Sequence, residues 1–311
     1  MSEFLSMVMV RFSEIAIKGA KTRSWLTSRL ISHIDFLLRA NKIDNFQIIR
    51  EYSRVFVKSS DNKKVETIIC SLVPGAVSTS EVFQCSSDIE EINSCVEQLF
   101  FSKFIKGSTF SVKAKRTGKH PYTSVELGAK VGEFILDNNK EKELKVDLTN
   151  PEYSLKVEVR DDKAYVFDET KQGLGGLPVG SQGKVLVLVS GIQEDISNII
   201  QLYKRGAVTQ IYSLKKISEV DSDFKQSIIQ ILNLQPQLKH KEKEIYFSKE
   251  NLETNHLVEY YESNKCLGLA LSKTIFNEIE NKLPVKIPIF VPHLVDEVDE
   301  TEIAKVLTTV F

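Results

Sequence analysis

The stretch Lys184-Val-Leu-Val-Leu-Val-Ser-Gly191 decides how the C-terminal part of this 311-residue sequence folds. Its apolar residues follow one another without a break, which is typical of a strand that is buried on both faces of a parallel sheet. A helical pattern over 195–205 comes next, and a buried strand that feeds a helix is the unit of α/β domains. Later apolar runs alternate with further helical stretches and cover 210–214, 244–247, 266–271 and 286–291. We therefore expect an α/β domain over 173–311.

Two blocks of mixed helices and strands precede this domain. The first block has the order strand, helix, strand, strand, helix, with which a ferredoxin-like unit begins. These elements are expected at 8–10, 22–40, 46–49, 55–57 and 65–70. The second block runs from a helix at 89–100 to a strand at 163–168, and the glycine-rich connector 173–180 follows it. We expect two α+β domains, over 1–75 and 76–172.

The composition excludes several classes of protein. Lys and Arg number 41 against 42 Asp and Glu, so the net charge of -1 gives no general affinity for polyanions, and any such site must be local. No window approaches the roughly 18 uncharged apolar residues of a membrane span. The cysteines form no CxxC pair and no zinc-finger spacing, so we expect free thiols, a cytoplasmic location and no metal. They are Cys70, Cys85, Cys95 and Cys266.

Two windows of the sequence contain basic residues and no acidic ones. The window between Glu97 and Glu126 carries Lys103, Lys106, Lys113, Lys115, Arg116 and Lys119, followed by His120 and Tyr122. Such cations can bind phosphates, and an aromatic ring can stack on a base. The second window, 15–34, carries Lys18, Lys21, Arg23 and Arg29. Runs of charge are usually solvated faces, but two basic windows in adjacent small domains favour a nucleic-acid surface.

Ser190-Gly191 follows the decisive strand, and open α/β sheets bind ligands at the carboxyl ends of their parallel strands. A nucleotide phosphate there would meet the N–H groups of a helix N-terminus, but Glu194 and Asp195 would occupy the place of the anion. Helix capping by these carboxylates is therefore the preferred interpretation. The connector 173–180 is followed by polar residues and a strand, so we interpret it as a bend and not as a dinucleotide fingerprint.

Three further residues have structural interpretations. His293 lies near two acidic residues, but no nucleophile matches it, so we expect a loop histidine. Cys266 lies in an apolar run, which is typical of an inert core thiol. Trp25 and the stretch 36–38 are expected on a packed helix face.

Three segments of the sequence resemble, in order and spacing, the tRNA 4-thiouridine synthetases, a tRNA sulfurtransferase family linked to thiamine biosynthesis. They are Val10-Arg-Phe-Ser-Glu-Ile-Ala-Ile-Lys-Gly19, Ala114-Lys-Arg-Thr-Gly-Lys-His-Pro-Tyr-Thr-Ser124 and Gly175-Gly-Leu-Pro-Val-Gly180. Residues 147–152 and 157–160 add similarity to a THUMP domain. The resemblance implies a ferredoxin-like domain, a THUMP domain that binds the tRNA acceptor end, and a Rossmann-like PP-loop domain that adenylates uridine 8. The expected tRNA-binding residues are Lys18, Lys21, Lys113, Lys115, Arg116, Lys119, Tyr122 and Arg160.

The third domain departs from this family at its nucleotide loop. The family's loop reads Ser-Gly-Gly-x-Asp-Ser, and an ungapped alignment places Ile192 on the second glycine, Glu194 on the aspartate and Asp195 on the final serine. A Cβ at Ile192 obstructs the approach of a phosphate, and a carboxylate repels it. We expect a vestigial nucleotide site made of Leu188, Val189, Ser190, Gly191, Glu194 and Asp195.

Two more departures concern the later part of the sequence. The family's nucleotide-contacting Gly and Gln fall on Asn264 and Leu269. The sequence ends at Phe311, before the place where the resemblance implies a sulfur-relay cysteine and a rhodanese domain. We therefore expect a degenerate catalytic half.

Three hypotheses follow from these patterns. The first is a tRNA-binding protein with no catalytic residue, metal or cofactor, acting as a structural, chaperone-like or partner subunit. The second is a divergent tRNA sulfurtransferase that uses ATP and Mg²⁺ and takes sulfur from sulfide or from a partner's persulfide. The third, an α/β protein that binds no RNA, leaves both basic windows unexplained. We prefer the first hypothesis, with tRNA, a sulfur-donor protein or catalytic subunit, and a second copy in a homodimer as partners, and no membrane.

Overall fold

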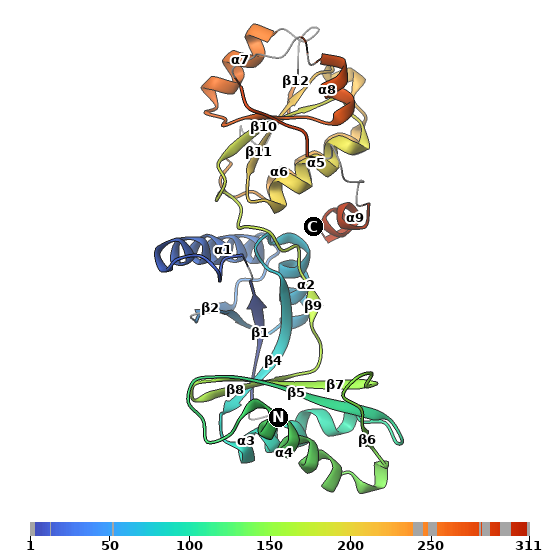
Figure 1. The fold of residues 1–311 in the computed structure, drawn as a ribbon. Coiled ribbons are helices and arrows are strands. Elements are labelled where there is room, and N and C mark those ends of the chain that lie inside the picture. Colours follow the sequence, from blue (N-terminus) through green and yellow to red (C-terminus); the bar gives the residue numbers. More distant parts are fainter. Residues whose placement is uncertain are drawn as a thin grey trace. The chain divides into compact units, whose positions relative to one another are not determined.

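The computed structural model describes residues 4–12, 14–51, 53–238, 245–247, 254–279, 281, 287–292 and 300–309. The chain forms two compact units (Figure 1). The first unit comprises 1–10, 45–66 and 79–171, and the second comprises 11–44, 67–78 and 172–311. Each unit therefore combines segments that lie far apart in the sequence.

The first unit is built on one sheet. Its strands are β1 (Leu5–Arg11), β2 (Phe46–Arg50), β3 (Val55–Ser59), β4 (Ser78–Ser86), β5 (Thr109–Thr117), β6 (Lys145–Val146), β7 (Tyr153–Arg160), β8 (Lys163–Phe167) and β9 (Lys171–Gln172). In the described residues they lie in the order β2-β3-β1-β4-β8-β7-β5-β6, and β9 pairs with β4. Strand β5 is parallel to β6 and β7, whereas β4 and β7 are both antiparallel to β8. Strand β4 thus joins the strands of the N-terminal block to the later ones in a single sheet.

Two helices cover one face of β5, β7 and β8 (Figure 1). Helix α3 (Ile89–Phe100) is capped by Asp88, and helix α4 (Ser124–Asp137) begins with a capping box between Thr123 and Glu126. Leu155 and Val157 of β7 pack with buried residues of both helices. Because side chains alternate along a strand, the remaining residues of β5 and β7 point away from the helices. Short 3-10 helices follow at η1 (Phe101–Lys103) and η2 (Lys140–Lys142).

A second apolar cluster holds the N-terminal strands to β8. It consists of Met7, Met9, Phe56, Val82, Tyr165 and Phe167. The rings of Phe56 and Tyr165 stack with their centroids 4.6 Å apart. The cluster thereby joins side chains of β1, β3, β4 and β8 within the sheet whose later strands carry the α3 and α4 core.

The second unit contains a parallel sheet. Its strands are β10 (Lys184–Val189), β11 (Val208–Ser213), β12 (Tyr246–Phe247), β13 (Leu269–Ala270) and β14 (Ile289–Phe290). In the described residues they lie in the order β12-β11-β10-β13-β14, and every neighbouring pair is parallel. The order reverses between β10 and β13, as in doubly wound sheets. The predicted fold class, α+β domains followed by a Rossmann-like α/β domain, is confirmed.

Helices lie on both faces of this sheet (Figure 1). On one face, α5 (Gln193–Lys204), α6 (Ser222–Asn233) and α9 (Glu300–Thr309) contact one another. On the other, α7 (Thr254–Ser263) and α8 (Lys273–Ile279) pack on a cluster that includes Leu186 and Tyr212. The 3-10 helix η3 (Ile217–Glu219) precedes α6.

Helix α1 (Ala20–Ala40) also belongs to the second unit, while α2 (Asn62–Leu72) is divided between the units. The buried His33 of α1 donates a hydrogen bond from Nε2 to the carbonyl of Leu234, at 2.8 Å. Leu37 and Leu38 are fully buried, as predicted for this helix face. No helix in the described ranges is long and apolar enough to cross a membrane. The four cysteines are free and buried.

Candidate nucleic-acid interface and nucleotide loop

The predicted basic cluster on β5 is divided between the two faces of the sheet. Lys113 and Lys115 are exposed and point away from the helices, because the alternating residues Val112 and Ala114 pack against the α3 and α4 core. Arg116 follows Val112 and Ala114 in the alternation, and its charge acts on Glu126 at the start of α4. The structure therefore brings Lys113 and Lys115 together and turns Arg116 to the opposite face.

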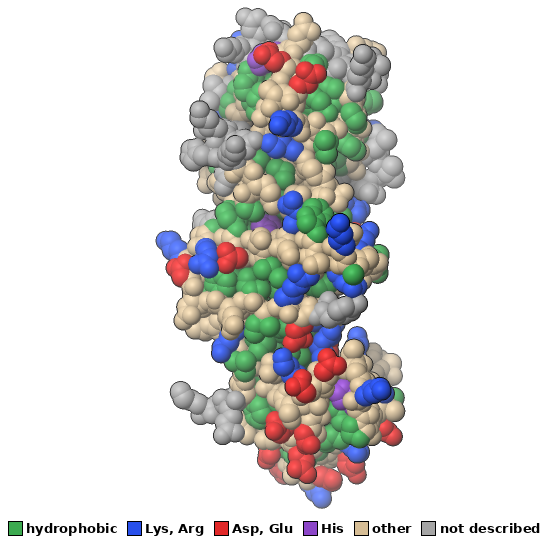
Figure 2. All heavy atoms as spheres, turned by 90° about the vertical axis from the view of Figure 1, so that its left-hand side faces the viewer, with side chains coloured by type: hydrophobic (Ala, Val, Ile, Leu, Met, Phe, Trp, Pro, Cys, Tyr) green, Lys and Arg blue, Asp and Glu red, His purple; other side chains and the backbone are tan. Residues whose placement is uncertain are grey.

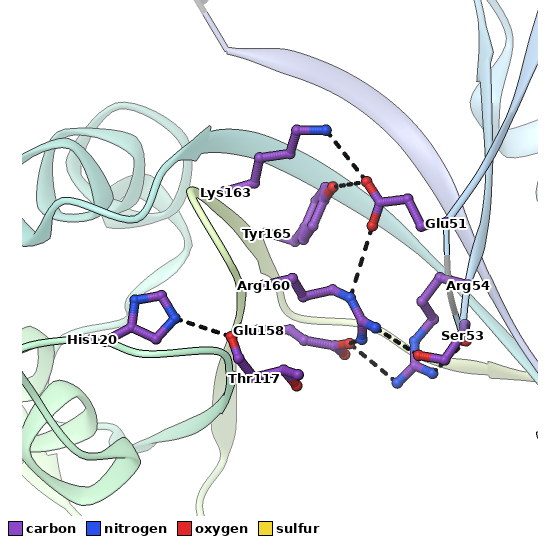
Figure 3. Close-up of polar contacts among 9 residues, drawn as sticks. All are labelled: Glu51, Ser53, Arg54, Thr117, His120, Glu158, Arg160, Lys163 and Tyr165. Carbon is purple, nitrogen blue, oxygen red and sulfur yellow. Dashed lines mark hydrogen bonds and ion pairs between the residues drawn. The ribbon is translucent and has the colours of Figure 1, made fainter.

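A tight loop after β5 carries Lys119, and Arg116 near the end of β5 contacts this loop. Arg116 Nη1 donates to the carbonyl of Gly118 at 3.0 Å, and Lys119 is exposed. Gly118 has φ +100°, and a Cβ there would lie 2.9 Å from Asp161 Oδ1, so only glycine fits without a shift of that carboxylate. His120 Nε2 donates to the carbonyl of Thr117 at 3.0 Å (Figure 3). The loop is thus held against the turn between β7 and β8.

Tyr122 does not occupy the position that was predicted for it. The side chain is 5% exposed, and its hydroxyl donates to the carbonyl of Ser87 at 2.6 Å. Burial raises the pKa of this hydroxyl. The His120 ring stacks on Tyr122, with centroids 5.4 Å apart and an interplanar angle of 18°. A base can stack only on an accessible ring, and in this structure the Tyr122 ring is buried and supports His120.

Arg160 is also placed differently from the prediction. Its side chain is 12% exposed, and its Nη1 donates to Glu158 Oε1 at 2.8 Å (Figure 3). Its Nη2 donates to the hydroxyl of Ser53 at 2.6 Å, and its Nε lies 3.8 Å from Glu51 Oε2. Two carboxylates therefore neutralise this guanidinium within the protein, and the predicted contact of Arg160 with tRNA stays a prediction.

Further contacts extend this ion-pair network. Arg54 Nη2 lies 3.1 Å from Glu158 Oε1, and burial lowers the pKa of Arg54. Lys163 Nζ and the Tyr165 hydroxyl lie 3.3 and 3.0 Å from Glu51 Oε1 (Figure 3). The network ties the turn between β2 and β3 to the hairpin of β7 and β8. Sequence reasoning missed Glu51, Ser53, Arg54 and Glu158, and only the alternation Glu158-Val-Arg160 hinted at a pair.

The other predicted cations belong to the second unit. Lys18 and Lys21 are exposed at the start of α1. Trp25, which was predicted to pack, is 45% exposed, so that prediction is wrong. The face of the molecule in Figure 2 carries both basic and acidic side chains, in agreement with the net charge of -1. A polyanion surface on this protein is therefore local, as the composition indicates.

The loop after β10, predicted as a vestigial nucleotide site, is occupied by a side chain of the protein itself. Asp195 Oδ2 accepts hydrogen bonds from the backbone N–H groups of Ser190, Gly191 and Ile192, at 2.8, 3.0 and 3.2 Å. Asp195 is fully buried, and burial raises its pKa although these hydrogen bonds act in the opposite direction. A carboxylate oxygen thus sits where a bound phosphate would receive the same N–H groups.

Glu194, in the first turn of α5, forms hydrogen bonds to the start of α8. Its Oε1 accepts from the backbone N–H of Lys273 at 2.8 Å, and its Oε2 accepts from the Thr274 hydroxyl at 3.1 Å. These contacts tie the loop after β10 to the start of α8, which follows β13. The crevice at which the strand order reverses is where open α/β sheets bind ligands. Here Glu194 connects α5 to the start of α8, and Asp195 fills the loop after β10.

The remaining residues that the sequence singled out are buried or take part in local hydrogen bonds, apart from His293. Leu188 and Val189 are buried within β10, and Leu269 is buried within β13. Asn264 donates from Nδ2 to the carbonyl of Tyr260 at 2.8 Å, which closes the end of α7. Cys266 is 6% exposed, as predicted for a core thiol. His293 lies outside the described residues, and the described residues contain no cluster of His, Cys, Asp and Glu that could hold a metal ion.

Comparison with known proteins identifies the N-terminal half. Residues 7–80 match the ThiI ferredoxin-like domain, and residues 86–169 match the THUMP domain. A probable tRNA sulfurtransferase of Methanosarcina acetivorans is 33% identical over 210 residues, which are 67% of this chain and 50% of that protein. One from Methanocaldococcus jannaschii is 37% identical over 234 residues, which are 70% of this chain and 60% of that protein. The chain is a relative of the tRNA sulfurtransferases.

Solved structures extend the likeness of fold over both units of this tRNA sulfurtransferase relative. The crystal structure of PH1313 from Pyrococcus horikoshii superposes with a TM-score of 0.77 at 23% identity, covering 97% of this chain and 98% of that one. A 4-thiouridine synthetase in complex with RNA and ATP superposes with a TM-score of 0.67 at 21% identity, covering 98% and 84%. This tRNA sulfurtransferase relative spans 50% to 60% of the length of the two archaeal sulfurtransferases it matches.

Proposed function

We propose that this protein binds tRNA and does not adenylate it. One observation carries the second part: Asp195 Oδ2 takes the three N–H groups of the loop after β10. In an adenylating loop these groups hold the phosphates of ATP. A triphosphate would have to displace a buried carboxylate and then approach Glu194, which already caps the neighbouring helix. We therefore assign the vestigial site Leu188, Val189, Ser190, Gly191, Glu194 and Asp195 a structural role.

Two kinds of observation support tRNA as the ligand. The first is the THUMP domain together with relatives named probable tRNA sulfurtransferases and the similar fold of a 4-thiouridine synthetase that was solved in complex with RNA. The second is the position of the cations, since Lys113, Lys115 and Lys119 are exposed in the first unit and Lys18 and Lys21 in the second. Phosphate contacts of this kind supply most of the sequence-independent affinity for nucleic acids. Arg116 contributes from the opposite face of β5.

The proposal also covers the domain boundaries, the cellular location and the partners of the protein. We place the domain boundaries near residues 75 and 172 and, because all four thiols are free, the protein in the cytoplasm. No cofactor or metal is required for binding tRNA. A catalytic subunit or a sulfur-donor protein would complete any chemistry on the bound tRNA, and a homodimer is a further candidate assembly.

A second candidate function has one observation in its favour. Gly191 has φ +90° next to Ser190, so the loop keeps the backbone turn of a phosphate-binding strand end. This backbone turn, together with relatives named probable tRNA sulfurtransferases, supports an ATP-dependent tRNA sulfurtransferase. Such an enzyme would use Mg²⁺ and would take sulfur from sulfide or from a partner's persulfide. In that case tRNA binding would have to withdraw Asp195 from the loop.

Calorimetric titration of ATP, with and without saturating tRNA, tests the proposal. Binding of labelled tRNA, followed by fluorescence anisotropy, is measured first. We expect tRNA binding and no heat of ATP binding under either condition. ATP binding that depends on tRNA would establish the second candidate, and absence of tRNA binding would refute both.

A further inference from the structure

Trp25 is held in place on the surface of α1. It is the one tryptophan of the sequence, and its side chain is 45% exposed. The guanidinium carbon of Arg29, one turn further along the helix, lies 4.7 Å from the centre of the indole. A Cβ on Gly180 would lie 2.8 Å from Arg29 Nη1, so this guanidinium is confined between the indole and the connector. The indole is therefore positioned by Arg29 and is open to solvent.

The surroundings of Trp25 are polar and carry one sign of charge. The helix neighbours three and four positions before and after it are Lys21, Thr22, Ser28 and Arg29. Residues 15–34 contain no carboxylate, and Lys18 and Lys21 are exposed. The next acidic residue along α1, Asp35, is paired with Arg39 at 3.1 Å. Within α1, Trp25 is therefore an exposed apolar residue whose helix neighbours are hydroxyl or basic residues, and the exposed Ile17 lies just before the helix.

An exposed indole beside basic residues helps to distinguish among lipid-binding, protein-binding and nucleic-acid-binding surfaces, all of which use tryptophan. A lipid surface requires a broad exposed apolar face, and large protein interfaces require a contiguous apolar patch. Among the described residues of α1, the nearest helix neighbours of Trp25 are hydroxyl or basic residues and do not widen its ring into such a face. Cations beside an isolated aromatic ring fit single-stranded nucleic acid, whose phosphates and unstacked bases each find a partner.

We propose that the face of α1 that carries Lys18, Lys21 and Trp25 is an RNA contact, in which an unpaired base stacks on the indole and the two lysines bind phosphates. Arg29 is a positioning residue that holds the indole. This inference rests on the proposed function and adds a contact outside the THUMP domain. It assigns to Trp25 the stacking role for which Tyr122 is too deeply buried.

The single tryptophan allows a direct test on the full chain. Unmodified tRNA is titrated while Trp25 emission and the anisotropy of a label on the RNA are both recorded. We expect Trp25 emission to be quenched with the same midpoint as the anisotropy change. Anionic phospholipid vesicles of phosphatidylserine and phosphatidylcholine should leave the emission unchanged.

Substitutions complete the test. Because stacking of a base on an aromatic side chain is worth about 1–3 kcal/mol, Trp25→Ala should weaken tRNA binding by roughly 5- to 150-fold. Trp25→Phe should restore most of the loss, and the control Arg39→Ala on the same helix should change the affinity less than about twofold. Thermal melting of each variant confirms that it is folded.

The outcomes separate this inference from the proposed function. Normal tRNA binding with unchanged Trp25 emission, or with full affinity in Trp25→Ala, overturns the inference and leaves the proposed function standing. Quenching by vesicles overturns it in favour of a lipid surface. Absence of tRNA binding by anisotropy refutes the proposed function itself.

Discussion

Arg160 of β7 donates a hydrogen bond at 2.6 Å to the hydroxyl of Ser53, which lies 107 residues earlier in the chain. The same guanidinium pairs with Glu158 at 2.8 Å, and that carboxylate also pairs with Arg54. These contacts fix the turn between β2 and β3 on the hairpin of β7 and β8. Arg160, which the sequence predicted as an RNA ligand, thus connects the ferredoxin-like strands to the THUMP strands.

Arg160→Ala should lower the free energy of unfolding without changing how RNA binding depends on salt. Hydrogen bonds to charged groups contribute about 1.5–3 kcal/mol, and the substitution removes the contacts of Arg160 with Glu158 and Ser53. Urea unfolding followed by circular dichroism measures the first effect. Arg39→Ala breaks a solvent-exposed pair and, as the control, should leave the free energy of unfolding nearly unchanged. A reduced salt slope in Arg160→Ala would return this residue to the RNA surface.

Lys113→Ala and Lys115→Ala should weaken tRNA binding through phosphate contacts. Each phosphate that is lost should reduce the slope of log affinity against log salt by roughly 0.7–0.9. Anisotropy titrations at several salt concentrations measure the slope. Lys58→Ala, an exposed lysine of the same unit outside the basic windows, is the control and should keep the slope of the unmodified protein. Equal slopes for the Lys113, Lys115 and Lys58 variants would remove β5 from the interface.

Much of this arrangement is readable from the sequence. The unbroken apolar run at 184–189 predicts the buried strand β10, and the acidic residues after Ser190-Gly191 predict that the loop holds carboxylates. The sequence could also have predicted that the cations of β5 lie on opposite faces of the sheet. Arg116 lies an odd number of positions from Lys113 and Lys115, and side chains alternate along a strand.

Other features depend on contacts that no local pattern encodes. Tyr122 is buried because Ser87, 35 residues away, accepts its hydroxyl hydrogen bond, and Arg160 is paired through the distant turn at Ser53. Trp25 was wrongly predicted to pack because large apolar residues in helices usually do. Its position between Arg29 and solvent depends on the connector at Gly180, which reaches α1 only in the folded chain.

Asp195→Ser should open the nucleotide loop to phosphate. Two unit charges about 4 Å apart at an effective dielectric of about 20 interact by roughly 4 kcal/mol, and half of that already changes an affinity more than tenfold. Lys215 Nζ lies 3.8 Å from where a Cβ on Gly191 would be, so a cation is at hand. We expect calorimetry to detect ATP binding in Asp195→Ser, and more strongly when Ile192→Gly is added.

The matched control for this prediction is Asp223→Ser, the same change at an exposed position of α6. It should bind no more ATP than the unmodified protein. If the unmodified protein binds ATP as tightly as Asp195→Ser, the carboxylate does not block the site.

His33 should make the second unit less stable in mild acid. Burial lowers its pKa from 6.5 to about 4, so the folded state holds the neutral ring while the unfolded chain takes up a proton. The stabilising contribution is complete above pH 6.5 and is lost as the pH falls toward 4, by about 3 kcal/mol. Urea unfolding at several pH values should show this loss in the unmodified protein.

His33→Gln keeps a hydrogen-bond donor for the Leu234 carbonyl but has no titrating group. Its free energy of unfolding should therefore depend less on pH between 6.5 and 4. Equal losses in both proteins would show that His33 is not the group responsible.

The most direct test of the central claim is to measure the release of pyrophosphate from ATP. The assay contains sulfide and tRNA, the latter at a concentration at which its binding to the protein has been shown. With Asp195 occupying the loop, we expect tRNA to be bound, no pyrophosphate to be released above the blank, and no thiolated tRNA to form. Release of pyrophosphate that requires both tRNA and the unmodified protein would contradict this and establish a divergent sulfurtransferase.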